Sequence, residues 1–173
     1  MKDIIGLDLS LTSTGVAHGD TQYTINSKFT DVRRLNEIST NIAALVSDFA
    51  EPAVVMEGYS FGSRNSQSHS IGELGGVVKL ALWRLKVPVV IVPPTSRAKF
   101  ATGRGNASKS EVVSAVSART GIVWEGKGAD DKCDAWLLQE IGLYYFGAPR
   151  YEWPASHVVG LEKIDFDPFG VEE

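Results

Sequence analysis

The sequence predicts an α/β fold, in which a mixed sheet of about five strands is flanked by helices. Apolar runs of strand length alternate along the chain with amphipathic helical stretches, as expected when helices cover a sheet. The chain has 173 residues, 43% of them hydrophobic, which is enough for one proper core. We therefore expect one domain over residues 1–146 and a C-terminal extension over 147–173, in which no element is predicted.

The N-terminal elements follow from short apolar runs and one amphipathic stretch. Residues 3–9, 15–18 and 23–25 are predicted to form three strands of a hairpin meander. A helix is expected over 33–49, where apolar residues recur at spacings of three and four. A further apolar strand is expected over 53–57.

The remaining elements alternate in the same way. In chain order they are a polar loop over 59–68, a helix over 70–86, a strand over 87–92, a loop over 95–107 and helices over 108–119 and 130–146. Ser108 followed by Glu111 is the pattern of a helix capping box. Gly72 and Gly76 cost helix stability, and close approach of another backbone is the expected reason for them.

Four acidic residues stand where packing alone does not call for them. Asp8 and Glu57 each close an apolar strand, and such strands can meet at one edge of the sheet. Asp131 and Asp134 are three apart near the start of a helix, which puts both on one face. Carboxylates near a core are usually paired or bind a metal, and oxygen ligands that converge suit Mg²⁺ or Mn²⁺.

Each acid also has a structural interpretation. An aspartate after a strand is often a turn residue or a helix cap, and an acid near a helix N-terminus is favoured by the helix dipole. Asp130 is expected to be the cap of its helix. Taken together, the four acids are predicted to hold two divalent ions, which activate water and stabilise the leaving group in phosphodiester hydrolysis. The lone cysteine, Cys133, is assigned to core packing.

Positive charge is concentrated in the middle of the chain, although the formal net charge is −4. Residues 58–119 contain nine Lys or Arg and two acids, a local charge of +7. A solvated surface is one explanation, and a surface that binds a polyanion is the other. In the loop 102–109, glycines allow a DNA phosphate to approach, and the alternative is a flexible turn before the helix. The basic residues predicted to contact DNA are Arg64, Lys99, Arg104 and Lys109.

Two aromatic residues follow Glu57 in a polar loop, where no pattern buries them. Tyr59 or Phe61 could stack on an unpaired base, or fold back onto the core, and the register does not distinguish the two residues.

Other classes of site and location are disfavoured by composition. One cysteine and three scattered histidines cannot supply a zinc site, and one cysteine fits a reducing compartment. No run approaches the ~20 apolar residues of a membrane span. We expect a cytoplasmic protein with no membrane association.

Four motifs occur in a recognisable order. They are Ile5-Gly6-Leu7-Asp8-Leu9-Ser10 with Gly15-Val16-Ala17, then Met56-Glu57, then the loop 102–109, then Asp131-x-x-Asp134-Ala135. Over residues 3–146 the chain resembles the RuvC family of Holliday-junction resolvases in the ribonuclease H-like superfamily, and most of all its phage-borne members. The family often has proline and glycine after the first aspartate, where this chain has Leu9-Ser10. That departure puts the sequence specificity of the cellular resolvases in doubt.

The resemblance implies that Asp8, Glu57, Asp131 and Asp134 are the metal-binding catalytic acids of a Mg²⁺-dependent endonuclease, with Mn²⁺ as a substitute. The implied substrate is branched DNA: a four-way junction, with forks and flaps as further candidates. The implied location is the cytoplasm, that of the host cell if the gene is phage-borne. Because a junction has near two-fold symmetry, we expect a homodimer, with the helix carrying Gly72 and Gly76 as its interface.

Two other classes of function remain. A protein of the same fold could bind branched DNA without cutting it. An actin-like kinase also carries Gly-x-Asp in its first strand, but such enzymes need two such domains, and 173 residues are too few.

Overall fold

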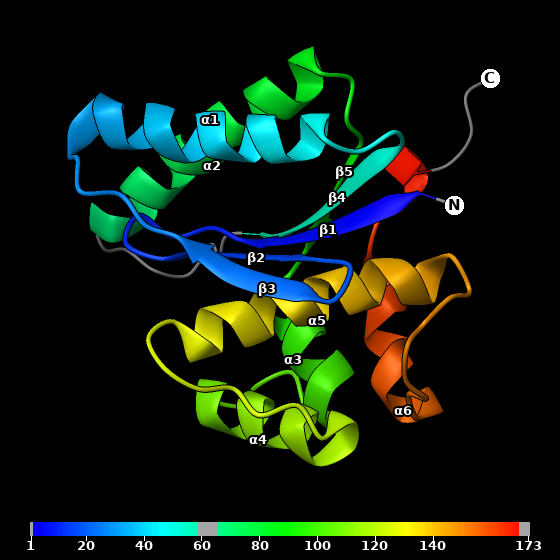
Figure 1. Ribbon diagram of the computed structural model, residues 1–173. Helices are drawn as coiled ribbons and strands as arrows, with labels where there is room; N and C mark the ends of the chain where they lie inside the picture. Colours follow the sequence, from blue (N-terminus) through cyan, green and yellow to red (C-terminus); the bar gives the residue numbers. More distant parts are fainter. Residues whose placement is uncertain (1, 59–65, 170–173) are drawn as a thin grey trace.

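The computed structural model describes residues 2–58 and 66–169, and the predicted DNA contacts Tyr59, Phe61 and Arg64 lie outside these ranges. The described chain forms a five-stranded sheet between two layers of helices (Figure 1). The strands are β1 (Asp3–Asp8), β2 (Thr14–His18), β3 (Thr21–Ile25), β4 (Pro52–Glu57) and β5 (Val89–Val92). Their order in the sheet is β3-β2-β1-β4-β5. The predicted mixed α/β sheet is confirmed.

The direction of the strands decides which strand ends meet. β1, β2 and β3 form the predicted antiparallel meander, whereas β4 and β5 run parallel to β1. In the register, Leu7 pairs with Met56 of β4, and Asp8 pairs with Gly15 of β2. The C-terminal ends of the neighbouring strands β1 and β4 therefore lie together, and each ends in an acid.

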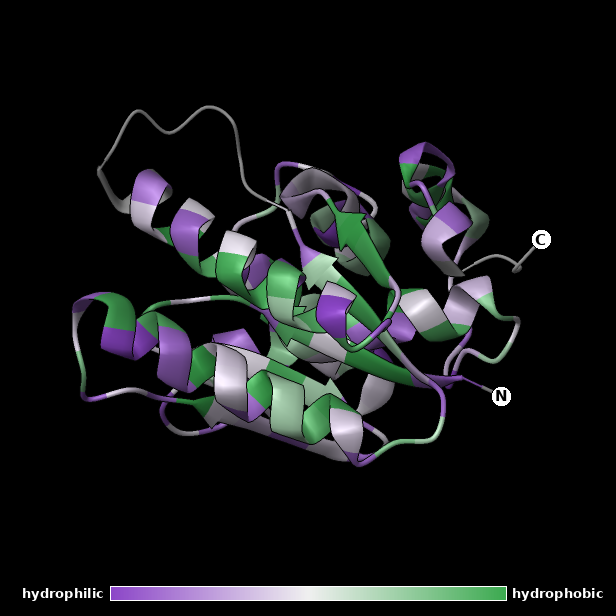
Figure 2. Cartoon of the chain, turned by 90° about the horizontal axis from the view of Figure 1, so that it is seen from above, coloured by the Kyte–Doolittle hydropathy of each residue, from purple (hydrophilic) through white to green (hydrophobic). Residues whose placement is uncertain are grey.

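One face of the sheet is covered by α1 (Asp31–Ser47) and α2 (Ser66–Arg84), and the other by α5 (Ala129–Tyr145) with α3 (Pro94–Thr102) and α4 (Lys109–Thr120) (Figure 1). The strands between these layers are largely apolar, whereas the helices alternate apolar and polar residues around their surfaces (Figure 2). Burial of both sheet faces explains why the central strands are almost continuously hydrophobic.

Alternation along β1 and β4 aims the two strand-end acids at the same face. Ile5 and Leu7 pack in the cluster under α1 and α2, whereas Ile4 packs toward α5. Because side chains alternate along a strand, Asp8 faces α5 as Ile4 does. By the same alternation Glu57 of β4 lies on the α5 face.

Two glycines allow α5 to approach the sheet closely. A Cβ atom added to Gly6 would lie 2.0 Å from the carbonyl oxygen of Ala135, and one added to Gly15 would lie 2.1 Å from that of Asp131. No side chain fits at either position, so the backbone of α5 rests directly on β1 and β2. This contact brings the first turns of α5 next to the end of β1.

The C-terminal segment packs on the α5 side, where no element was predicted. It contains α6 (Ala155–Val158) and the short 3-10 helices η1 (Val159–Lys163) and η2 (Asp167–Phe169). Glu140, fully buried on α5, accepts hydrogen bonds from Arg150 and from the indole of Trp153. The Trp153 ring also lies 4.1 Å from that of Phe100 between centroids. The segment is thus tied to the same core by buried polar and aromatic contacts.

Two local predictions are wrong. The predicted loop over 95–107 contains α3, because Pro94 occupies the first helical turn and residues such as Phe100 face the core. Asp130 is not the cap of its helix, since Gly128 takes that position.

The described chain itself makes no close backbone approach to Gly72 or Gly76, where an added Cβ would meet nothing within 4 Å.

Two other local predictions, the capping box and the buried cysteine, are confirmed. The capping box between Ser108 and Glu111 is present, and these bonds, with that of Arg104, lower the pKa of Glu111 to about 2. Cys133 is fully buried in the core, and burial raises the pKa of its thiol. None of the helices in the described part of the chain is long and apolar enough to cross a lipid bilayer.

Candidate metal centre and active site

Three of the four predicted acids gather at the C-terminal ends of β1 and β4. Asp8 is 8% exposed at the end of β1, and the Glu57 side chain is 19% exposed at the end of β4. Asp134, on α5, is only 1% exposed. The charges of Glu57 and Asp134 both act on Asp8. The structure therefore brings together acids separated by more than a hundred residues in sequence.

Asp131 lies one helical turn before Asp134, near the same end of the sheet. Its backbone carbonyl contacts Gly15, which pairs with Asp8. Its carboxylate lies 3.8 Å from the Nζ atom of Lys109, and Lys109 also forms a 3.1 Å ion pair with Asp130. The fourth acid thus stands at the edge of the cluster and faces a lysine.

A buried arginine lies between the acids. Arg97, on α3, is 6% exposed and donates from Nε to Oε1 of Glu57 at 2.5 Å. Its Nη1 atom donates to Oδ1 of Asp134. One guanidinium therefore joins β4 to α5 at the centre of the acid cluster.

Burial and mutual repulsion shift the titration of the acids. Burial, followed by the charges of Glu57 and Asp134, raises the pKa of Asp8 well above its ordinary value. Burial also raises the pKa of Asp134 to about 6, although the charge of Arg97 opposes this rise. Burial alone would lower the pKa of Arg97, but the carboxylates of Glu57 and Asp134 outweigh it and raise that pKa. Two neighbouring carboxylates with raised pKa values are typical of a functional site.

Comparison with known proteins now places the chain in a family. No protein-family profile matches the sequence. Among curated proteins, the crossover junction endodeoxyribonuclease RuvC of Parasynechococcus marenigrum is 32% identical over 114 residues, covering 66% of this chain and 73% of that protein. The chain belongs to the RuvC family. The RuvC of Prochlorococcus marinus (strain NATL1A) is 29% identical over 111 residues, covering 64% of this chain and 71% of that protein.

Solved structures support the fold of this RuvC-family chain. The RuvC of T. thermophilus, solved in complex with a Holliday junction substrate, gives a TM-score of 0.67 at 19% identity and covers 89% of this chain and 100% of its own. The yeast mitochondrial Holliday junction resolvase Ydc2 gives 0.54 at 14% identity and covers 80% of this chain and 76% of its own. At these identities the likeness concerns the architecture of the sheet and its helices.

Carboxylate oxygens are the kind of ligand that a divalent cation prefers, although the acids do not form a closed ligand set. Within residues 2–58 and 66–169, no three Asp, Glu, His or Cys side chains converge closely enough to hold a metal ion. The Oδ2 atom of Asp134 is buried and accepts no hydrogen bond. A buried carboxylate oxygen without a partner is costly, and a hard cation would satisfy it.

The predicted DNA contacts of this RuvC-family chain differ in their surroundings. Arg104 is exposed and pairs with Glu111 at 2.6 Å. The alkyl chain of Lys99 lies against Gly160 in η1. Lys109 is connected to the acid cluster through its ion pair with Asp131.

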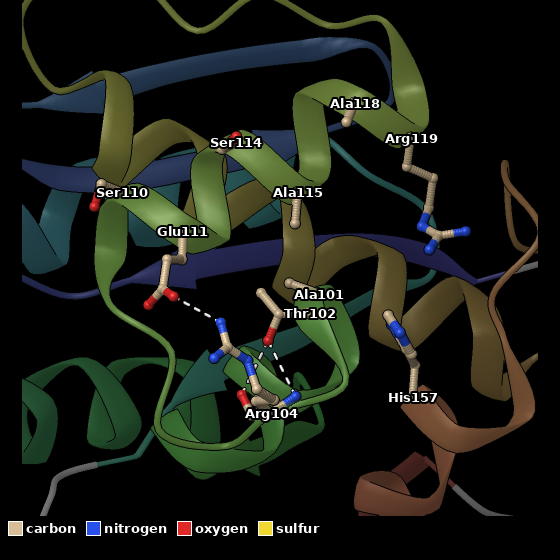
Figure 3. Close-up of a pocket in the computed structure, with 10 residues that line it drawn as sticks. All are labelled: Ala101, Thr102, Arg104, Ser110, Glu111, Ser114, Ala115, Ala118, Arg119 and His157. Atoms are coloured by element: carbon tan, nitrogen blue, oxygen red, sulfur yellow. Dashed lines mark hydrogen bonds and ion pairs between the residues drawn. The ribbon is translucent and has the colours of Figure 1, made fainter.

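A shallow hollow of about 730 Å³ opens between α3, α4 and α6, where Arg104 and Glu111 face each other at its mouth (Figure 3). Small side chains of α4, such as Ser114 and Ala115, form its wall, and His157 closes the far side. None of the four acids lines it. The hollow is therefore separate from the candidate metal centre.

The sequence did not identify Arg97 as part of the site. Arg97 was counted there only as one of the nine basic residues in 58–119. The signal that was present is the pair Pro93-Pro94, which starts a helix directly after a strand parallel to that of Glu57. A residue in the first turn of such a helix lies near the same sheet edge.

Proposed function

We propose that the protein is a metal-dependent endodeoxyribonuclease that recognises the structure of branched DNA and cleaves four-way junctions. Membership of the RuvC family supports the reaction. The observation that carries the proposal is the convergence of Asp8, Glu57 and Asp134 from two parallel strands and a helix onto one buried cluster. Buried ion pairs are weak evidence for a purely structural role, because apolar side chains of similar volume often stabilise a fold as well or better.

Asp8, Glu57, Asp131 and Asp134 would hold the metal, with Mg²⁺ the proposed ion, Mn²⁺ a substitute and two ions the proposed number. When bound, the metal supplies an activated water and neutralises charge on the leaving oxygen. The chain itself supplies the rigid placement of the acids. β1 and β4 fix Asp8 and Glu57 through their ladders, and the N-terminal end of α5 adds a positive dipole beside Asp131 and Asp134.

DNA binding is assigned to basic residues around the start of α4. Lys109, which faces Asp131, would contact a phosphate close to the cleaved bond, and Arg104, in the loop before α4, would contact one farther from it. Lys99, Arg64 and one of Tyr59 and Phe61 complete the proposed surface. The proposed substrate implies action in the cytoplasm, in the host cell if the gene is carried by a phage.

A homodimer would provide the paired cuts that a two-fold symmetric junction requires. Exposed apolar side chains near the C-terminal end of α2 support a contact there: Leu80, Trp83 and Leu85 are 47%, 75% and 44% exposed. Gly72 and Gly76, which nothing in the described chain approaches, lie on the same helix. Sedimentation velocity should give twice the 18.7 kDa of one chain. A monomer at high concentration would contradict this interface.

The activity test uses end-labelled four-way junctions, forks, flaps and linear duplex of the same sequence. With Mg²⁺ the junction should be nicked symmetrically, linear duplex should stay intact, and EDTA should abolish cleavage. Asp8→Asn should bind the junction but cut it at least a hundredfold more slowly, because the metal loses a charged ligand. If Asp8→Asn behaved like the wild type and neither cut DNA, the protein would be a branched-DNA-binding protein.

A further inference from the structure

Arg97 is the feature of the acid cluster that the proposed chemistry does not use. Its side chain reaches from α3 to Glu57 on β4 and to Asp134 on α5, and it is almost completely buried. Arginine forms charge-assisted bonds with carboxylates that are stronger than neutral hydrogen bonds. The two bonds hold these acids at the positions seen in the structure.

The charges in the cluster do not balance. Asp8, Glu57 and Asp134 carry three negative charges when ionised, Arg97 supplies one buried positive charge among them, and Lys109 adds a second from the edge. The donors of Arg97 occupy Oε1 of Glu57 and Oδ1 of Asp134, while Oδ2 of Asp134 has no hydrogen-bond partner. The cluster is therefore partly neutralised, and one buried acceptor still lacks a donor or a cation.

A metal ion and this guanidinium compete for the same two acids. Both are cations that draw on the charge of Glu57 and Asp134, of which Arg97 already binds one oxygen each, and two cations this close repel strongly in a partly dry environment. Glu57 and Asp134 are both turned toward Arg97, so the oxygens bound by the guanidinium are not free to serve as ligands in this arrangement.

We propose that Arg97 is a built-in competitor of the divalent cation, which holds Glu57 and Asp134 in place while no metal is bound and withdraws from them when metal binds. The inference rests on the proposed function and assigns a positioning residue to its site. Arg97 lowers the affinity for metal, and its ion pairs with Glu57 and Asp134 stabilise the folded protein when no metal is bound.

The test compares Mn²⁺ binding, measured by electron paramagnetic resonance of free Mn²⁺ and by calorimetry, with no DNA present. Arg97→Met removes the charge without adding an oxygen ligand, and should bind Mn²⁺ roughly tenfold more tightly, or more. Arg97→Lys retains the charge and should bind more weakly than Arg97→Met. Arg84→Met, an exposed position at the end of α2, is the matched control and should bind like the wild type.

Thermal unfolding gives a second readout that does not depend on activity. In EDTA, Arg97→Met should melt at a lower temperature than the wild type, because Glu57 and the buried Asp134 lose their ion-pair partner. Addition of Mg²⁺ should raise its Tm by more than it raises that of the wild type.

A folded Arg97→Met protein that binds Mn²⁺ as weakly as the wild type, or more weakly, would overturn the inference. So would Arg97→Lys binding as tightly as Arg97→Met. An Arg97→Met protein that stays unfolded at saturating Mg²⁺ would also overturn it, since Arg97 would then be a permanent structural brace. Junction cleavage by the wild type with Mg²⁺ tests the proposed function separately. If no variant bound Mn²⁺ and the wild type cut nothing, both proposals would fail.

Discussion

At the scale of single residues, the cluster is a compromise between burial and charge. Asp134 is almost inaccessible to solvent, and this burial raises its pKa to about 6 in spite of the bond from Arg97. The pKa of Asp8 is likewise raised by burial and by its acidic neighbours. The metal-free protein therefore stores unfavourable electrostatic free energy in its site, which a bound cation would relieve.

A pH dependence of stability follows for the metal-free protein. Between about pH 4 and 6 folded Asp134 holds a proton that the unfolded chain releases, so its ionisation makes folding less favourable as the pH rises. The stability of the wild type relative to Asp134→Asn should fall from pH 4 to pH 7, by up to about 3 kcal/mol. Urea unfolding in EDTA measures this difference, and a difference independent of pH would contradict the assigned environment.

The residues of the cluster were predictable to different degrees. Asp8 and Glu57 could be found because an acid that ends an apolar strand is out of place, and Asp134 because its spacing from Asp131 fits one helix face. Arg97 could not be singled out in the same way. The Arg97 side chain points inward only because α3 forms, and α3 was not predicted. From the sequence alone, a buried arginine in a basic stretch cannot be told from an exposed one.

At the scale of elements, the approach of α5 to β1 and β2 builds the site. Gly6 and Gly15 remove the side chains that would hold the helix away, and the helix carries Asp131 and Asp134 into position. The strands, four of the helices and the capping box could be predicted from periodicity and local signals. The helix α3 and the C-terminal turns could not, because their short lengths give little periodicity and their stability comes from packing: Phe100 of α3 lies in the core with α5, and Trp153 packs on Phe100.

Gly15→Ala tests the close approach. The new Cβ would lie 2.1 Å from the carbonyl oxygen of Asp131, so α5 must shift. We expect a loss of about 1–3 kcal/mol of unfolding free energy. Junction cleavage should fall by roughly a hundredfold, because a shift of about 1 Å misplaces the acids.

Thr40→Ala, at an exposed position of α1, is the stability control, and it should change the unfolding free energy by less than about 1 kcal/mol. Gly15→Ala with wild-type stability and cleavage would show that α5 does not depend on this glycine.

At the scale of the whole molecule, charge is divided between a basic middle segment and acidic flanking segments. The loop before α4 and its first residue belong to the basic segment, whereas β1 and α5 supply acids. Folding places Lys109 beside Asp130 and Asp131, so the two kinds of charge meet at the candidate site. A polyanion can then be held against an acidic centre, provided that cations neutralise that centre.

Lys109→Ala should weaken binding of a four-way junction and flatten its dependence on salt. One phosphate contact contributes a log-log slope of about −0.9 on duplex DNA, so the slope should become less negative by about that amount. Fluorescence anisotropy over a range of salt concentrations measures it. Lys163→Ala, which removes the same charge from the C-terminal segment, should leave the slope unchanged. Equal slopes for Lys109→Ala and the wild type would remove Lys109 from the DNA contact.

Anomalous diffraction from crystals soaked in Mn²⁺ tests the central claim most directly, since it locates the cation without reference to activity. We predict Mn²⁺ bound by carboxylate oxygens of Asp8, Glu57 and Asp134, with the guanidinium of Arg97 displaced from Glu57 and Asp134. Mn²⁺ found only elsewhere on the molecule, with both ion pairs of Arg97 intact at saturating metal, would contradict the assignment of these acids as a metal centre.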